Sequence, residues 1–386
     1  MTMHKDLFLL LREYGSLTSP KAITFPSHLP LAFITNFLIR SILSNPHFQR
    51  YPPATQFQQQ WWKRIISLLE EQASKDQANE IDSRIFDYYV SLLPSSGPPP
   101  GSMQLEIRNQ ICGRGIPVVG ELPSKSFITH FWKSATPGPD KSSVNGEGSE
   151  EINLHDYQVT TLQESRTLIE SGTTGLRTWP ASHVLAQYLI DHPEDLVENN
   201  RILELGCGIG FLGIIVATLQ QLPSGDENES TSCVWLTDVN EEVLIQCRRN
   251  LQLACNLSSS HPRVHYHALD WSDALGSDTT ALRTLLHDEI NPSLILGADI
   301  VFDPSLVPLL VALLSLALGP TNLKRLALIA LTVRNQETFD LFLSTAKEQG
   351  LHAEDVDVGN QHLFSVDAMP GSEPKDDVRI LRFRTT

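Results

Sequence analysis

The segment Arg201-Ile-Leu-Glu-Leu-Gly-Cys-Gly-Ile-Gly-Phe-Leu-Gly-Ile-Ile-Val-Ala217 joins two apolar runs through closely spaced glycines. The first run, 201–205, is typical of a short buried strand, and the second, from Phe211, is compatible with a helix. Glycines at 206, 208 and 210 allow a tight turn and a close approach of a ligand, because they carry no Cβ. A strand that leads through such a turn into a helix directs backbone N–H groups at a ligand above the strand end. The segment therefore predicts a nucleotide-cofactor turn.

Downstream of this turn, predicted strands alternate with predicted helices. Further strands are expected at 234–238, 263–269, 293–299, 325–332, 352–358 and 378–384, and helices at 181–191, 241–253, 307–318 and 335–349. This alternation is typical of an α/β fold whose parallel sheet is covered on both faces. Only a polar loop separates the last two strands, which favours an antiparallel end. We expect a Rossmann-like, seven-stranded, mostly parallel sheet with an antiparallel last strand.

The chain divides into three expected regions. These are an N-terminal helical domain (1–95), a linker with a β-hairpin extension and a mobile loop (96–155), and the cofactor domain (156–386). In the first region, apolar residues recur at helical spacing in 31–43, 57–71 and 82–93. The adjacent Trp61 and Trp62 favour the core of a helical bundle over a partner surface.

Two strand-like segments, 126–132 and 157–162, predict the hairpin that leans on the sheet domain. Three segments are expected to lack regular structure. The stretch 95–101, rich in Pro, Gly and Ser, predicts a turn or linker, 135–151 a mobile loop, and the polar, acidic 223–232 a surface insertion.

Composition limits the partners. The chain has 386 residues and a net charge of −16, which argues against a nucleic-acid surface. The five cysteines form no CxxC pair and the 13 histidines show no ligand spacing, so we expect free thiols and no metal. The N-terminus does not resemble a secretory signal, and the longest apolar run, 306–318, is too short to span a membrane. We expect a cytoplasmic monomer without a membrane partner.

Two cofactors compete for the glycine turn. The spacing of Gly208, Gly210 and Gly213 fits the dinucleotide pattern GxGxxG, which is a weak indication alone. Glu204 to Gly210 also fits an acid-x-Gly-x-Gly-x-Gly pattern, with the acid inside the strand. A carboxylate there would repel a pyrophosphate, whereas it can bind near the cationic methionine end of S-adenosylmethionine. Glu204 therefore favours S-adenosylmethionine, and an NAD(P)-dependent oxidoreductase remains the alternative.

Three further residues fit a nucleoside. Asp238 ends the second strand, where an acid accepts hydrogen bonds from ribose hydroxyls in either cofactor class. Its alternative role is to cap the helix that begins at Glu241. Asp270 and Trp271 follow the third strand, where the indole can stack on adenine while the carboxylate reaches the adenine amine. The alternative for Trp271 is a plain core position.

These residues resemble a known family. Glu204-Leu-Gly-Cys-Gly208, Leu269-Asp-Trp271 and Gly297-Ala-Asp-Ile-Val-Phe302 are similar to motifs of the seven-β-strand protein-lysine methyltransferases. The run Ser171-Gly-Thr-Thr-Gly-Leu-Arg-Thr-Trp179, with Leu162-Gln-Glu-Ser and a helical extension ahead of it, resembles the lysine methyltransferases of eukaryotic elongation factor 2 in fungi and animals. The resemblance covers about residues 155 to 386 and is looser before them.

The resemblance implies a site and a substrate. It implies cofactor contacts from Trp179, Gly206, Cys207, Gly208, Asp238, Trp271 and Ala298. It also implies a substrate-side catalytic role for Asp299 and Phe302, where relatives often carry a tyrosine whose hydroxyl Phe302 lacks. Asp299 would orient the lysine amine, and its alternative role is to cap a helix or brace a loop. The implied substrate is elongation factor 2, with another protein, or a histidine, as the alternative acceptor.

Overall fold

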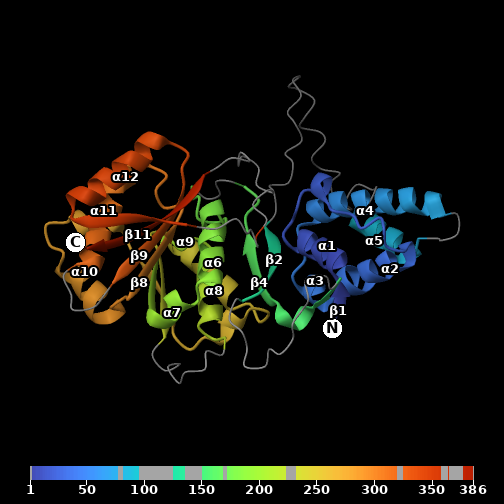
Figure 1. Cartoon of the computed structure of the whole chain (residues 1–386), viewed down its shortest axis with the longest axis horizontal. Coiled ribbons are helices and arrows are strands. Elements are labelled where there is room, and N and C mark those ends of the chain that lie inside the picture. Colours follow the sequence, from blue (N-terminus) through green and yellow to red (C-terminus); the bar gives the residue numbers. More distant parts are fainter. Residues whose placement is uncertain are drawn as a thin grey trace, which may run out of the picture.

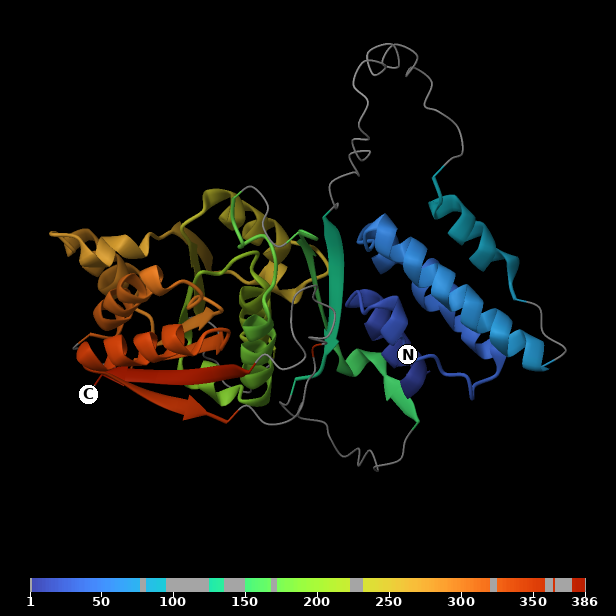
Figure 2. The same cartoon turned by 90° about the horizontal axis from the view of Figure 1, so that it is seen from above.

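The computed structural model describes residues 2–76, 81–94, 125–134, 150–167, 172–222, 232–319, 325–357, 364 and 377–385. The expected linker 95–101 lies outside these residues, as do nearly all of the expected mobile loop 135–151 and of the insertion 223–232. Figures 1 and 2 show a sheet unit, a bundle of N-terminal helices and a hairpin between them.

Seven strands form one sheet in the order β10-β11-β9-β8-β5-β6-β7. Their bounds are β5 Arg201–Leu205, β6 Cys233–Asp238, β7 Val264–Ala268, β8 Leu294–Ala298, β9 Leu326–Thr332, β10 Leu351–Val356 and β11 Val378–Thr385. The pairs β5–β6, β6–β7, β5–β8 and β8–β9 are parallel, whereas β11 runs antiparallel to β9 and β10. The predicted sheet is confirmed, and its last strand inserts between two earlier ones.

Helices cover both faces of this sheet. The helices are α6 Pro180–Asp191, α7 Glu194–Glu198, α8 Phe211–Leu219, α9 Glu241–Leu251, α10 Thr280–Thr284, α11 Val307–Leu318 and α12 Gln336–Glu348. Alternation along β5 separates two apolar clusters: Ile202 packs with α6, α8 and α9, and Leu203 with α10, α11 and α12. The apolar run 306–318 is the buried helix α11, as predicted, and no helix in the described ranges is long and apolar enough to cross a membrane.

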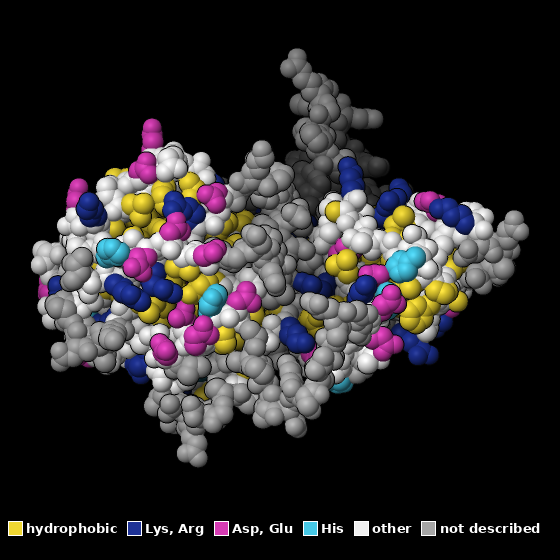
Figure 3. Space-filling model, in the orientation of Figure 1, with side chains coloured by type: hydrophobic (Ala, Val, Ile, Leu, Met, Phe, Trp, Pro, Cys, Tyr) yellow, Lys and Arg dark blue, Asp and Glu magenta, His cyan; other side chains and the backbone are white. Residues whose placement is uncertain are grey.

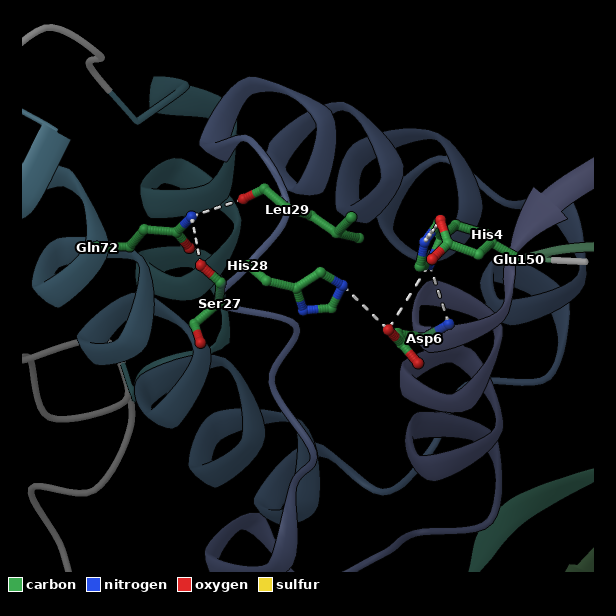
Figure 4. Close-up of polar contacts among 7 residues, drawn as sticks. All are labelled: His4, Asp6, Ser27, His28, Leu29, Gln72 and Glu150. Atoms are coloured by element: carbon green, nitrogen blue, oxygen red, sulfur yellow. Dashed lines mark hydrogen bonds and ion pairs between the residues drawn. The ribbon is translucent and has the colours of Figure 1, made fainter. Parts of the chain in front are cut away.

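The N-terminal unit is helical, as predicted. Its elements are β1 Thr2–His4, α1 Lys5–Gly15, α2 Leu31–Phe37 with a π-helical continuation Leu38–Leu43, α3 Pro46–Arg50, α4 Thr55–Asp76 and α5 Ser83–Leu92. Trp61 and Trp62 are fully buried, which confirms their place in the core. Figure 4 shows how the segment before α2 is held, with the Gln72 amide donating to the Leu29 carbonyl oxygen at 2.7 Å.

The hairpin joins the two units. Strand β2 (Ser126–Trp132) pairs antiparallel with β4 (Gln158–Glu164), so the hairpin continues beyond residue 155, and α1 packs on β2. On the sheet side, Asn256 accepts a hydrogen bond from the Thr161 N–H at 2.8 Å and donates to the Thr161 carbonyl at 2.7 Å. The short β3 (Glu151–Asn153) pairs with β1. One continuous apolar cluster therefore runs from the N-terminal helices through the hairpin to the sheet.

Candidate functional site

A cavity of about 450 Å³ opens at the carboxyl ends of the parallel strands. This is the edge where ligands bind in open α/β sheets. Its wall consists of the turn after β5, the segments that follow β6, β7 and β8, the segment that leads into α6, and the start of α11. The lining residues are Gly172, Thr173, Thr174, Gly175, Arg177, Thr178, Trp179, Ser182, Gly206, Cys207, Gly208, Ile209, Phe211, Asp238, Val239, Leu269, Asp270, Trp271, Ala298, Asp299, Ile300, Phe302, Leu306 and Leu309. All the predicted site residues except Glu204 are among them.

The glycine turn leaves little room for a side chain at position 206 or 208. Gly206 and Gly208 have φ values of +62° and +52°, which favour glycine. A Cβ on Gly206 would lie 2.7 Å from the Ile300 side chain, and one on Gly208 would lie 3.2 Å from the carbonyl oxygen of Gly175. Between them, Cys207 is buried with its Sγ 3.8 Å from that of Cys247. The turn is therefore pressed between the segment before α6 and the end of β8.

Asp238 holds this turn from the end of β6. Its carboxylate accepts the N–H of Gly208 at 3.2 Å and that of Asn240 at 3.0 Å. Burial raises the pKa of Asp238 above its usual range. The cap of α9 is Asn240, whose side chain accepts the N–H of Glu242, so the alternative that Asp238 caps this helix is wrong.

Trp271 and Asp270 lie beside the turn at the end of β7. The indole contributes to the lining, and its Cζ2 would lie 3.7 Å from a Cβ placed on Gly206. Asp270 accepts the N–H of Ser272 at 2.8 Å, which orients its carboxylate. An aromatic face next to a carboxylate suits a purine base and its amine.

Glu204 lies beneath the turn and outside the lining. It is 3% exposed, and its Oε2 atom would be 3.3 Å from a Cβ on Gly213, so the carboxyl faces the first turn of α8. Oε2 has no hydrogen-bond partner among the described residues. Burial, with a smaller contribution from the nearby Asp238, raises the pKa of Glu204 to about 8. A neutral carboxyl is thus favoured near pH 7.

Asp299 lies at the end of β8, where its carboxylate is extensively hydrogen-bonded. It accepts the N–H of Ala181 at 3.2 Å, and the N–H and hydroxyl of Thr332 at 3.0 and 3.1 Å. Arg334 adds an ion pair at 3.4 Å. The backbone of Asp299 is left-handed, with φ +54°, which is strained for a residue with a side chain. These contacts fit the alternative role of a bracing carboxylate.

Aromatic residues frame the rest of the cavity. Trp179 donates its indole N–H to the Thr174 carbonyl at 3.0 Å, and the guanidinium carbons of Arg177 and Arg334 lie 6.0 and 5.3 Å from its ring centre. Phe302 is 55% exposed and belongs to the lining, so it offers an apolar ring to solvent and cavity together. Phe302 lies in the segment that directly follows β8.

Two features escaped prediction. Arg177 lines the cavity, and the quoted motif contains it without assigning it a role. His4, Asp6 and His28 also come together, with ligand atoms within 4.8 Å of one another, which their sequence spacing does not indicate. Figure 4 shows Asp6 between the two rings, and the His28 Nε2–Asp6 Oδ2 distance is 3.2 Å. His4 also caps α1 by accepting the Asp6 N–H at 3.3 Å, so ion pairing and capping account for this cluster.

Comparison with known proteins identifies the segment that carries the cavity. Residues 160–349 match the family model described as lysine methyltransferase. This segment belongs to the lysine methyltransferase family. The family match covers most of β4, the segment before α6, the glycine turn and the motif that begins at Ala298, so it includes every residue of the lining.

Curated relatives match about half of the chain. The protein-lysine N-methyltransferase EFM3 of Chaetomium thermophilum is 36% identical over 196 residues, which cover 49% of this chain and 52% of the relative. Human protein-lysine N-methyltransferase EEF2KMT is 30% identical over 213 residues, covering 53% of this chain and 59% of the relative. EFM3 of Saccharomyces cerevisiae is 27% identical over 202 residues, covering 49% and 54%. The chain thus spans about half the length of the curated relatives it matches.

Proposed function

We propose that this protein is an S-adenosylmethionine-dependent protein-lysine N-methyltransferase that acts on eukaryotic elongation factor 2. One observation carries the proposal: the lining joins a crowded glycine turn, the Asp238 carboxylate and the Trp271 indole in a segment matched by the lysine methyltransferase model. The EFM3 and EEF2KMT relatives, each named a protein-lysine N-methyltransferase, support the reaction class.

The lining fits the proposed cofactor. Asp238 offers a carboxylate for ribose hydroxyls, and Trp271 offers a flat apolar surface for adenine with Asp270 at its edge. Because Gly206 and Gly208 lack a Cβ, the cofactor can approach the backbone of the turn. S-adenosylmethionine supplies a methyl group on a positively charged sulfonium. Glu204, beneath the turn, would favour that positive charge when it is ionised.

The acceptor side follows from the chemistry of an amine. A lysine amine has a pKa near 10.4, so its deprotonation costs roughly 4–5 kcal/mol at neutral pH. A cavity that excludes water and holds a cation disfavours the ammonium form, and water can remove the proton before attack. Phe302 and Trp179 present aromatic faces that attract a methylated ammonium. Asp299 acts here as a positioning residue, because it holds β8, β9 and α6 in register around the acceptor.

Elongation factor 2 is proposed as the substrate on two grounds: the sequence resemblance described above, and the name EEF2KMT of the human relative. The protein would act in the cytoplasm as a monomer, with the N-terminal helices and hairpin recognising the substrate. On the face shown in Figure 3, acidic and basic side chains are intermixed over both units. Recognition on this face would therefore use shape and individual ion pairs in preference to one charged patch.

Titration calorimetry with three ligands tests the cofactor class. S-adenosylmethionine and S-adenosylhomocysteine should bind, and NAD⁺ should not. Asp238→Ala should weaken both adenosyl ligands about tenfold or more, since it removes the ribose acceptor and a bond to the turn. Binding of NAD⁺ alone would contradict the proposal. Incubating a cell extract with methyl-labelled S-adenosylmethionine then tests the substrate, because the label should enter elongation factor 2.

A further inference from the structure

Arg177 is the one residue with a cationic side chain among the described residues that line the cavity. The residue is 7% exposed, and its Nε atom has no hydrogen-bond partner among the described residues. Burying a guanidinium is costly unless an anion or strong acceptors compensate for the lost water. A buried, under-bonded cation on a cavity wall thus indicates an anionic ligand group.

The described residues supply little compensation for this buried charge. Glu164 is the buried carboxylate that acts on Arg177 electrostatically, but it accepts the N–H of Thr178 at 3.1 Å. Within the described ranges, Arg177 forms no ion pair with any carboxylate at 4 Å or less. The Trp179 ring, at 6.0 Å, offers only the weaker attraction of an aromatic face.

The position of Arg177 assigns it to one end of the cavity. Arg177 lies in the segment that crosses the glycine turn, where the Gly175 carbonyl approaches Gly208, and it precedes α6, which packs on β8, β9, β11 and α8. Asp238 and Trp271 lie at the ends of β6 and β7, on the other side of β5 in the sheet. A nucleoside held by Asp238 and Trp271 would therefore extend its other end past the glycine turn toward Arg177.

We propose that Arg177 binds the α-carboxylate of the cofactor's methionine moiety. The inference rests on the proposed function, because it takes the ligand to be S-adenosylmethionine. Guanidinium and carboxylate match in shape and can form two parallel hydrogen bonds. The other charged side chains of the lining, Asp238, Asp270 and Asp299, are carboxylates that repel this group and suit hydroxyls, amines and cations. Arg177 thus fixes the orientation of the cofactor along the cavity.

Two ligands that differ in the amino-acid moiety provide the test. S-adenosylhomocysteine carries the α-carboxylate, and 5′-methylthioadenosine lacks it. Calorimetry should give Arg177→Gln a Kd for S-adenosylhomocysteine at least tenfold above that of the unaltered protein, with the Kd for methylthioadenosine changed by less than twofold. Arg177→Lys should give an intermediate loss for S-adenosylhomocysteine only. The control is Arg166→Gln, which removes a nearby charge from outside the lining and should leave both Kd values within twofold.

Each other outcome has a distinct meaning. An equal loss for both ligands in Arg177→Gln would show that Arg177 only supports the wall, and no loss for either would show that the carboxylate binds elsewhere. If Arg177→Gln shows no thermal unfolding transition and is therefore not folded, the same comparison is made with Arg177→Lys. If the unaltered protein binds neither ligand, the proposed function fails, and the inference fails with it.

Discussion

The carboxylate of Asp299 accepts a hydrogen bond from the backbone N–H of Ala181 at 3.2 Å and so ties the end of β8 to the first turn of α6. The same carboxylate binds Thr332 at the end of β9. Three elements around the cavity thus depend on one buried side chain, whose left-handed backbone is held in place by these bonds.

Asp299→Ala should lower the free energy of unfolding by about 2–3 kcal/mol, because several buried donors lose their acceptor. Urea denaturation measures this loss, and steady-state kinetics should show a raised KM for S-adenosylmethionine. Asp303→Ala is the matched control, since this exposed acid only caps the 3-10 turn Pro304–Leu306. An unchanged stability with a collapsed kcat would instead give Asp299 a direct role at the reacting amine.

Glu204→Gln should alter the pH dependence of stability. The folded protein keeps the Glu204 proton up to a pKa of about 8, whereas the unfolded chain releases it near pH 4.5. Within this window the folded state binds more protons, so this group makes stability fall as pH rises. The Tm of Glu204→Gln minus the Tm of the unaltered protein should therefore be higher at pH 8 than at pH 5. A pH-independent difference would mean that Glu204 is ionised in the folded protein.

Trp271→Ala should weaken S-adenosylhomocysteine binding about tenfold, since a stacked aromatic face contributes roughly 1 kcal/mol beyond the area that it buries. Calorimetry gives the Kd. The affinity for methylthioadenosine should fall by the same factor, because this ligand carries the same adenine. Trp235→Ala removes a half-buried indole that stacks on His265 in the sheet, outside the lining, and controls for lost packing. Equal losses in the two variants would remove Trp271 from adenine binding.

Deleting residues 1–95 should destabilise the remainder of the chain. The N-terminal helices share one apolar cluster with Ile128 and Trp132 of β2, and the deletion would expose these side chains. We expect thermal unfolding at least about 2–4 °C lower, which corresponds to roughly 1 kcal/mol or more in a domain of this larger size. An unchanged transition with intact cofactor binding and lost methylation would make the N-terminal unit a separable recognition module.

Local sequence patterns were sufficient for most of the sheet unit. Helix α11 has the bounds expected for it, 307–318, and β11 differs from its expected bounds by one residue. These elements are predictable because the periodicity of apolar residues and the placement of glycines are local properties of the sequence. The strands β1 and β3 were missed: each has three residues, and they pair across about 150 positions of sequence.

Some positions in the site could likewise be predicted from local sequence, and others depend on the tertiary structure. Asp238 and Trp271 line the cavity because the carboxyl ends of parallel strands share one edge of the sheet. The direction of the Glu204 side chain depends on the pleat of β5, which turns it toward α8. The motif alone could therefore not predict how deeply this side chain is buried. The burial of Arg177 depends on how the segment before α6 folds over the glycine turn, and spacing does not reveal that.

Intact-mass analysis of purified elongation factor 2 after incubation with this protein and S-adenosylmethionine tests the central claim most directly. We expect a gain of one to three methyl masses, absent when Asp238→Ala replaces the unaltered protein. Methylation of other proteins only would support the reaction class and rule out elongation factor 2 as the substrate. No methyl transfer to any protein, by an enzyme that binds the cofactor and is fully folded, would contradict the assignment as a protein-lysine methyltransferase.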